Sequence, residues 1–116
     1  MMRYYILLII CLFFPFSLYA IEKAEADSAY ARENYQEAAR LYEELLENGS
    51  NSDVYYNLGN CYYRLEKIAL SVLNYERALR LNPGDSQIRH NLELARNKTI
   101  DKVTPAGEVF IVTWYK

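Results

Sequence analysis

Small, apolar and aromatic residues between positions 52 and 85 recur at the spacing of two successive α-helices. The recurring positions are Leu58, Gly59 and Tyr62, and then, beyond a turn expected at Glu66 and Lys67, Ser71, Tyr75 and Ala78. Each set lies on one helical face, and the small residues Gly59 and Ala78 would let the two helices approach closely. Pro83 ends the second helix, because proline has no N–H to donate and disfavours helix in the residue before it. The pattern therefore predicts an antiparallel helix–turn–helix unit.

These positions resemble the tetratricopeptide repeat, a helix–turn–helix unit of about 34 residues. The matching residues are Tyr55, Leu58, Gly59, Tyr62, Ser71, Tyr75, Ala78 and Pro83. Ser71 departs from the alanine that the pattern prefers, but serine is small enough to keep the packing. The resemblance implies an all-α fold, a right-handed superhelical solenoid in which neighbouring repeats stack because a lone repeat cannot bury its apolar face.

Neighbouring segments repeat the pattern on both sides of this unit. Tyr35, Ala38 and Tyr42 precede Ile68, Ser71 and Tyr75 by one position less than a full repeat length. Asn91 and Leu92 follow Asn57 and Leu58 by a full repeat length, after an N-cap expected at Asp85 or Ser86. We therefore expect about two repeats, over residues 21–51 and 52–85, followed over 86–98 by a capping helix or the start of a third repeat.

The two ends of the chain differ in character from the repeats. Met1, Met2 and Arg3 precede an apolar run over residues 4–16, and Ala20 supplies a small residue at an expected cleavage site. This pattern predicts a signal peptide over 1–20 and export to the periplasm. An uncleaved anchor is the alternative, although Pro15 interrupts the run and about 20 apolar residues are needed to span a bilayer. Residues 99–116 are interpreted as a linker and a truncated apolar tail.

Charge is distributed unevenly along the chain. Residues 21–53 carry nine acidic and three basic side chains, whereas residues 54–116 carry six acidic and nine basic ones. Opposite ends of this kind favour head-to-tail self-association or the steering of a polar partner, and a merely solvated surface is the alternative. Nucleic acid is not an expected partner, because the chain is net acidic and has no dense basic stripe.

The residue inventory also argues against an enzyme. His90 is the only histidine, and removal of the leader leaves Cys61 as the only cysteine, so a His/Cys metal cluster cannot be assembled. Cys61 is expected to be a buried apolar thiol. Glycine-rich phosphate loops are missing from the sequence. We therefore predict a protein without catalytic residues, cofactor or metal.

The resemblance to tetratricopeptide proteins implies that a partner binds the concave face, which the first helix of each repeat lines. Tyrosine and asparagine side chains there would suit an extended peptide, since amides hydrogen-bond its backbone and rings cover its side chains. Alternatively, Asn57 and Asn60 serve only to hold neighbouring helices. The candidate residues are Lys23, Asp27, Tyr30, Asp53, Tyr56, Asn57, Asn60, Tyr63, Arg64, His90 and Asn91.

A narrower resemblance extends past the repeats. The segments LNYERALRLNPGD, IRHNLELARNKTIDKV and VFIVTWYK are similar to the BatE family, tetratricopeptide proteins of the Bacteroides aerotolerance operons. This implies a scaffold at the cytoplasmic membrane that works with other Bat proteins, some with von Willebrand factor A domains. Membrane association would come from the N-terminal segment or from sequence beyond residue 116. The alternative is a structural solenoid that acts through self-association without a peptide ligand.

Overall fold

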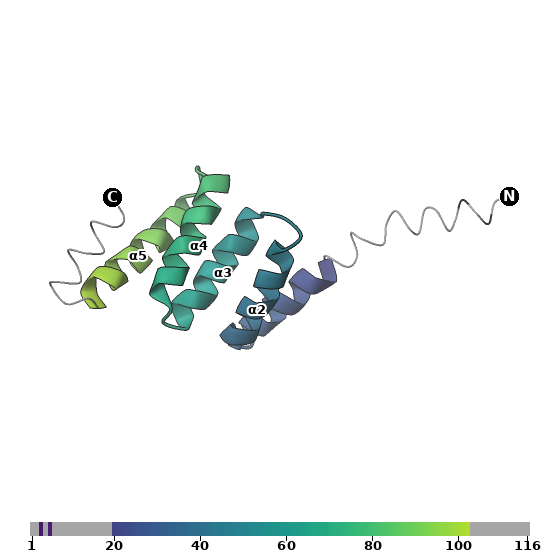
Figure 1. Cartoon of the computed structure of the whole chain (residues 1–116), viewed down its shortest axis with the longest axis horizontal. Coiled ribbons are helices and arrows are strands. Elements are labelled where there is room, and N and C mark those ends of the chain that lie inside the picture. Colours follow the sequence, from purple (N-terminus) through teal and green to yellow (C-terminus); the bar gives the residue numbers. More distant parts are fainter. Residues whose placement is uncertain (1–2, 4, 6–19, 103–116) are drawn as a thin grey trace.

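The computed structural model describes residues 3, 5 and 20–102, and this part of the chain is built from helices and turns without a strand. A helix over residues 20–31 is followed by α2 (Tyr35–Leu46), α3 (Ser52–Arg64), α4 (Ile68–Leu81) and α5 (Ser86–Lys102). The helices lie side by side in chain order, with connections at alternating ends (Figure 1). No helix within these residues is both long and apolar enough to cross a membrane.

Two layers of apolar packing hold the stack together. Helix 20–31, α2 and α3 share a core that includes Ala26, Tyr42 and Leu58, whereas α4 and α5 share a second core around Val72 and Leu92. α3 contacts both α2 and α4, so it joins the two layers. The expected all-α fold class is confirmed, and each of these helices buries its apolar face against its neighbour in sequence.

The turn inside each helix pair occurs twice with the same geometry. Glu33 and Glu66, which occupy equivalent places in the two pairs, both adopt the left-handed conformation with φ of 62°. In each turn, the N–H of the following residue reaches back to the preceding helix: Asn34 donates to the Ala29 carbonyl and Lys67 to the Tyr62 carbonyl, both at 2.9 Å. This arrangement satisfies carbonyls that a helix end would otherwise leave unpaired. The pair formed by helix 20–31 and α2 therefore repeats the turn of the pair formed by α3 and α4.

α3 and α4 pack tightly at Gly59. A Cβ atom at this position would lie 2.6 Å from Cδ1 and Cε1 of Tyr75, whose side chain is buried. Beside this contact, the buried Ser71 hydroxyl donates to the Gly59 carbonyl at 2.8 Å. The serine that departs from the repeat pattern therefore adds a hydrogen bond between the helices while remaining small enough for the packing.

The last helix begins where the sequence predicted and ends later. The Asp85 carboxylate accepts hydrogen bonds from the backbone N–H groups of Gln87 and Ile88, as an N-cap residue does. α5 then continues to Lys102, beyond the expected end at residue 98. Its exposed Glu93 stands one repeat length after Gly59. A charged side chain at that position differs from the small residue at Gly59. The assignment of α5 as a capping helix or as the start of a third repeat stays a prediction.

The predictions for the ends of the chain lie mostly outside the described residues. This applies to the signal peptide over 1–20, of which only residues 3, 5 and 20 are described, and to the tail from residue 103 onward.

Replacing Gly59 by alanine tests the close approach. We expect Gly59→Ala to lower the free energy of unfolding by about 1–3 kcal/mol, because overpacking against a buried ring outweighs the gain in helix propensity. Gly84→Ala is the matched control, because no atom would lie within 4 Å of the added Cβ. Urea unfolding followed by circular dichroism measures both. A Gly59→Ala protein as stable as the wild type would contradict the packing described.

At the left-handed turn residue Glu33, by contrast, we expect a substitution to increase stability. A side chain in this conformation costs roughly 1–2 kcal/mol, of which the greater flexibility of unfolded glycine offsets about 0.5–1 kcal/mol. We therefore expect Glu33→Gly to stabilise the protein by about 0.5–1 kcal/mol. The same change at Glu93, inside α5, should destabilise it by about 1 kcal/mol. Thermal and urea unfolding of the two variants would show the difference in sign, and destabilisation by both would contradict the strain assigned to Glu33.

Candidate functional site

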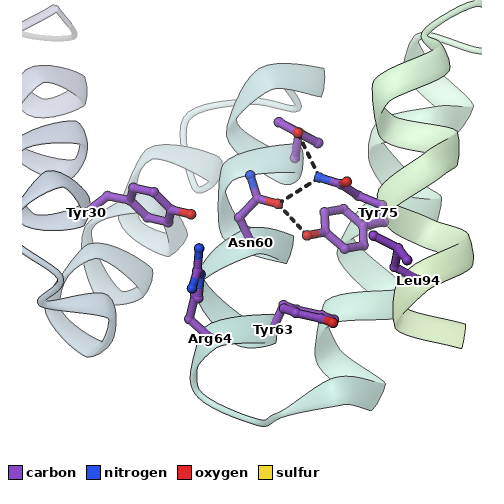
Figure 2. A pocket seen from close by; sticks show the side chains of 8 residues that line it. Tyr30, Asn60, Tyr63, Arg64, Tyr75 and Leu94 are labelled. Carbon is purple, nitrogen blue, oxygen red and sulfur yellow. Dashed lines mark hydrogen bonds between the residues drawn. The ribbon is translucent and has the colours of Figure 1, made fainter. Parts of the chain in front are cut away.

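A pocket of about 420 Å³ opens where helix 20–31, α3, α4 and α5 face a common space. Its walls carry phenol rings, amides, one leucine and one guanidinium (Figure 2). The lining residues are Tyr30, Tyr56, Asn60, Tyr63, Arg64, Tyr75, Asn91 and Leu94. The site is therefore assembled from residues far apart in sequence, and the stacking order of the helices brings them together.

One wall of the pocket is a hydrogen-bond network centred on Asn60. Its side-chain oxygen accepts a hydrogen bond from the Tyr75 hydroxyl and a longer one, of 3.4 Å, from Nδ2 of Asn91. The same Asn91 nitrogen donates to the Tyr56 hydroxyl at 2.8 Å. These bonds connect α3, α4 and α5 (Figure 2). Asn60 thus holds neighbouring helices, which is one of the two roles expected for it, while also lining the pocket.

The opposite wall pairs a phenol with a guanidinium. The Tyr30 hydroxyl and the Arg64 guanidinium lie close to each other on this side of the pocket (Figure 2). The Arg64 guanidinium lies 5.9 Å from the centre of the Tyr35 ring, and that ring meets Tyr30 edge-on with centroids 5.2 Å apart. Burial raises the pKa of Tyr30, and Arg64 opposes this shift. The phenol therefore stays protonated and the guanidinium stays cationic at neutral pH.

The floor near Tyr63 carries a second cation, which has a carboxylate partner. Nζ of Lys98 lies 4.6 Å from the centre of the Tyr63 ring and 3.0 Å from Oε1 of Glu66. These contacts fasten α5 to α3 and to the turn that follows it. Lys98 is not among the lining residues, and Arg64 is the charged residue in that set.

The pocket gathers six of the eleven residues proposed from the sequence: Tyr30, Tyr56, Asn60, Tyr63, Arg64 and Asn91. The other five do not line it. Lys23 and Asp27 form an ion pair at 2.9 Å, and the Asp27 carboxylate also accepts a hydrogen bond from Tyr42. Asp53 is exposed in the first turn of α3, Asn57 is half-buried on the same helix, and His90 is exposed on α5. Lys23 and Asp27 therefore contact each other, and Asp27 also contacts Tyr42 of α2, all within residues 21–51.

Two lining residues were not predicted. Tyr75 was assigned to helix packing alone, and its ring does pack against Gly59, but its hydroxyl reaches Asn60 at the pocket wall. A buried tyrosine needs a hydrogen-bond partner for its hydroxyl, and this requirement could have indicated that Tyr75 reaches a polar residue such as Asn60. Leu94 stands one repeat length after Asn60, so strict use of the repeat period would have placed it on the same face.

The pocket is lined by groups that can make noncovalent contacts. Within residues 3, 5 and 20–102, no group of three or more histidine, cysteine and acidic side chains is placed to hold a metal ion. Cys61 is buried, and burial raises the pKa of its thiol to about 12, so it is a packing residue rather than a nucleophile. The lining instead offers hydrogen-bond donors and acceptors, flat rings and one positive charge.

Residues 23–86 match the family model described as tetratricopeptide repeat. This match covers more than half of the chain and runs from helix 20–31 through α4. The chain belongs to the tetratricopeptide repeat family. A comparison with curated proteins gave no match. Tetratricopeptide repeats are generally noncatalytic units that mediate protein–protein interaction, and the pocket described here lies on the face formed by the first helices of the repeats together with α5.

Removing the acceptor at the centre of the network tests its energetic role. We expect Asn60→Leu to destabilise this tetratricopeptide protein by about 1–3 kcal/mol, because the buried Tyr75 hydroxyl loses its partner. Adding Tyr75→Phe should recover part of that loss, since no buried hydroxyl remains unpaired. A double-mutant cycle in urea measures the coupling. Simple addition of the two single effects would contradict the network.

Proposed function

We propose that this chain is a noncatalytic interaction scaffold that holds an extended segment of a partner protein in the pocket between helix 20–31, α3 and α5. The observation that carries the proposal is that six of the residues predicted from the sequence, which lie on three separate helices, line one pocket. Family membership supports the same general role, because tetratricopeptide repeats typically bind protein or peptide partners.

The lining suits an extended polypeptide. Rings of Tyr30, Tyr56 and Tyr63 provide flat apolar surfaces for side chains, and their hydroxyls, with the Asn91 amide, provide donors and acceptors for a peptide backbone. The network around Asn60 orients these groups before a ligand arrives, which reduces the entropy lost on binding. A prearranged mixture of rings and amides favours a peptide over a purely apolar ligand.

We extend this proposal to the cellular setting on the basis of sequence patterns. The leader pattern over residues 1–20 supports export to the periplasm, and the segments similar to the BatE family support a place in a membrane-associated aerotolerance complex. The partner would then be another Bat protein, including those with von Willebrand factor A domains. In this setting the solenoid presents its pocket on the periplasmic side of the cytoplasmic membrane.

Self-association is the second candidate function, and the ends of the stack favour it. A groove of about 540 Å³ between helix 20–31 and α2 contains Ile21, which is 57% exposed. At the other end, Ile100 of α5 is 46% exposed. The acidic excess of residues 21–53 and the basic excess of 54–116 would attract each other in a head-to-tail assembly.

Crosslinking of the exported chain in its own envelope tests the first candidate. The double variant Tyr63→Ser, Arg64→Ala removes a ring and a cation from the pocket. We expect it to lose a discrete crosslinked partner that the wild type retains. The matched control is Tyr55→Ser, Arg77→Ala, because Arg77 lies 5.9 Å from the Tyr55 ring outside the pocket. Circular dichroism checks that both variants remain helical.

An unchanged partner set in the pocket variant would contradict the site assignment. Salt-sensitive oligomers that persist in both variants without another protein would instead support self-association, because attraction between oppositely charged ends is screened by salt.

A further inference from the structure

We propose that the pocket selects its partner segment by a single acidic side chain, aspartate or glutamate, which pairs with Arg64. This inference rests on the proposed peptide-binding function and adds the chemical identity of the residue that is recognised. It concerns one carboxylate held by one guanidinium.

The first observation is the position and orientation of Arg64. It belongs to the last turn of α3, where its guanidinium is held against the Tyr35 ring at 5.9 Å and faces the Tyr30 hydroxyl (Figure 2). An arginine held in this way loses less side-chain freedom when a ligand binds than one extended into solvent. The guanidinium is therefore presented toward the pocket in a defined place.

The second observation concerns the ion pairs that other cations make within the described residues. Lys23 pairs with Asp27, Lys98 with Glu66 and Arg96 with Glu76, at 2.8–3.0 Å. Among residues 20–100, no ion pair within 4 Å includes Arg64. Electrostatic interaction with Tyr35 raises the pKa of the Arg64 guanidinium, and the carboxylate of Glu33 also acts on it through longer-range electrostatics and raises its pKa. The contacts of Arg64 are with aromatic side chains, so a ligand carboxylate would supply the anionic partner.

The third observation is the surface around that guanidinium. Tyr30 and Tyr63 flank Arg64 in the lining, and the amides of Asn60 and Asn91 lie beyond them. Rings can cover the methylene groups of a glutamate or aspartate side chain while the carboxylate meets the guanidinium, and arginine can bind a carboxylate through two parallel hydrogen bonds. Seven of the eight lining residues belong to 54–116, the segment with a basic excess, and this charge also favours an acidic segment.

Synthetic peptide libraries test the proposal directly. Three heptapeptide libraries have random flanks: one with a central glutamate and blocked ends, one with a central glutamine and blocked ends, and one with a central glutamine and a free C-terminal carboxylate. Each is passed over the immobilised full chain, and retention is measured by mass spectrometry. We expect the glutamate library to be retained about 10-fold more than the blocked glutamine library, as for a charge-assisted hydrogen bond.

Substitutions then assign the selectivity to Arg64. Arg64→Gln should reduce the ratio to about one, and Arg64→Lys should give an intermediate value because lysine keeps the charge without the planar fork. Arg77→Gln is the matched control, since Arg77 lies at the same 5.9 Å from a tyrosine ring but outside the pocket. It should leave the ratio unchanged. Circular dichroism confirms that each variant is folded.

The outcomes separate this inference from the function on which it rests. Equal retention of the two blocked libraries, abolished by Tyr63→Ser with Arg64→Ala, would overturn acid selection but support peptide binding in the pocket. Preferential retention of the free-carboxylate library would overturn side-chain recognition in favour of a chain terminus. Failure of all three libraries to bind would overturn both the inference and the proposed peptide-binding function.

Discussion

The contact between the Gly59 backbone and the Tyr75 ring sets the distance between α3 and α4, and the pocket depends on that distance. With the ring seated against the glycine, the Tyr75 hydroxyl reaches Asn60, and Asn60 in turn orients Asn91 of α5. A wider separation of α3 and α4 would break the first of these bonds and leave a buried hydroxyl unpaired. One steric requirement, the lack of a side chain at position 59, thus controls helix packing and the arrangement of polar groups at the candidate site.

The two repeats use the same internal bond with different acceptors. In repeat 1, Tyr42 donates to the carboxylate of Asp27, and in repeat 2, Tyr75 donates to the amide of Asn60. The charge on Asp27 attracts Lys23 and produces an ion pair on its own helix. The neutral Asn60 instead shares its oxygen with Asn91 on another helix. This difference explains why the polar network develops between α3 and α5 while repeat 1 contributes mainly Tyr30.

Much of the fold could be predicted from the sequence, because its determinants are local and periodic. Gly59, Ser71, Ala78 and Pro83 indicated two close helices and their end, and the recurrence of the pattern upstream indicated a second copy.

The candidate site was predicted less completely. A helical face places Asn57 and Asn60 near each other, but whether either lines a pocket depends on the angle between stacked helices, which no local pattern encodes. Tyr75 lies on the second helix of its repeat, and its hydroxyl reaches the site only because Gly59 admits its ring. Likewise, Lys23 and Asp27 pair with each other and do not line the pocket.

The position of α5 has a consequence for how the solenoid loses structure. In a linear stack each helix is held mainly by its sequence neighbours, so an end unit can detach while the remainder stays folded. α5 is the last helix of the described residues, and its Asn91 and Leu94 complete a cavity whose opposite side is Tyr30 of helix 20–31 (Figure 2). Any guest in that cavity would touch both the end helix and the start of the stack, and it would have to leave before α5 could peel away. A ligand in the cavity would therefore oppose the detachment of α5. Hydrogen exchange of the α5 amides would then be slower when the cavity is filled.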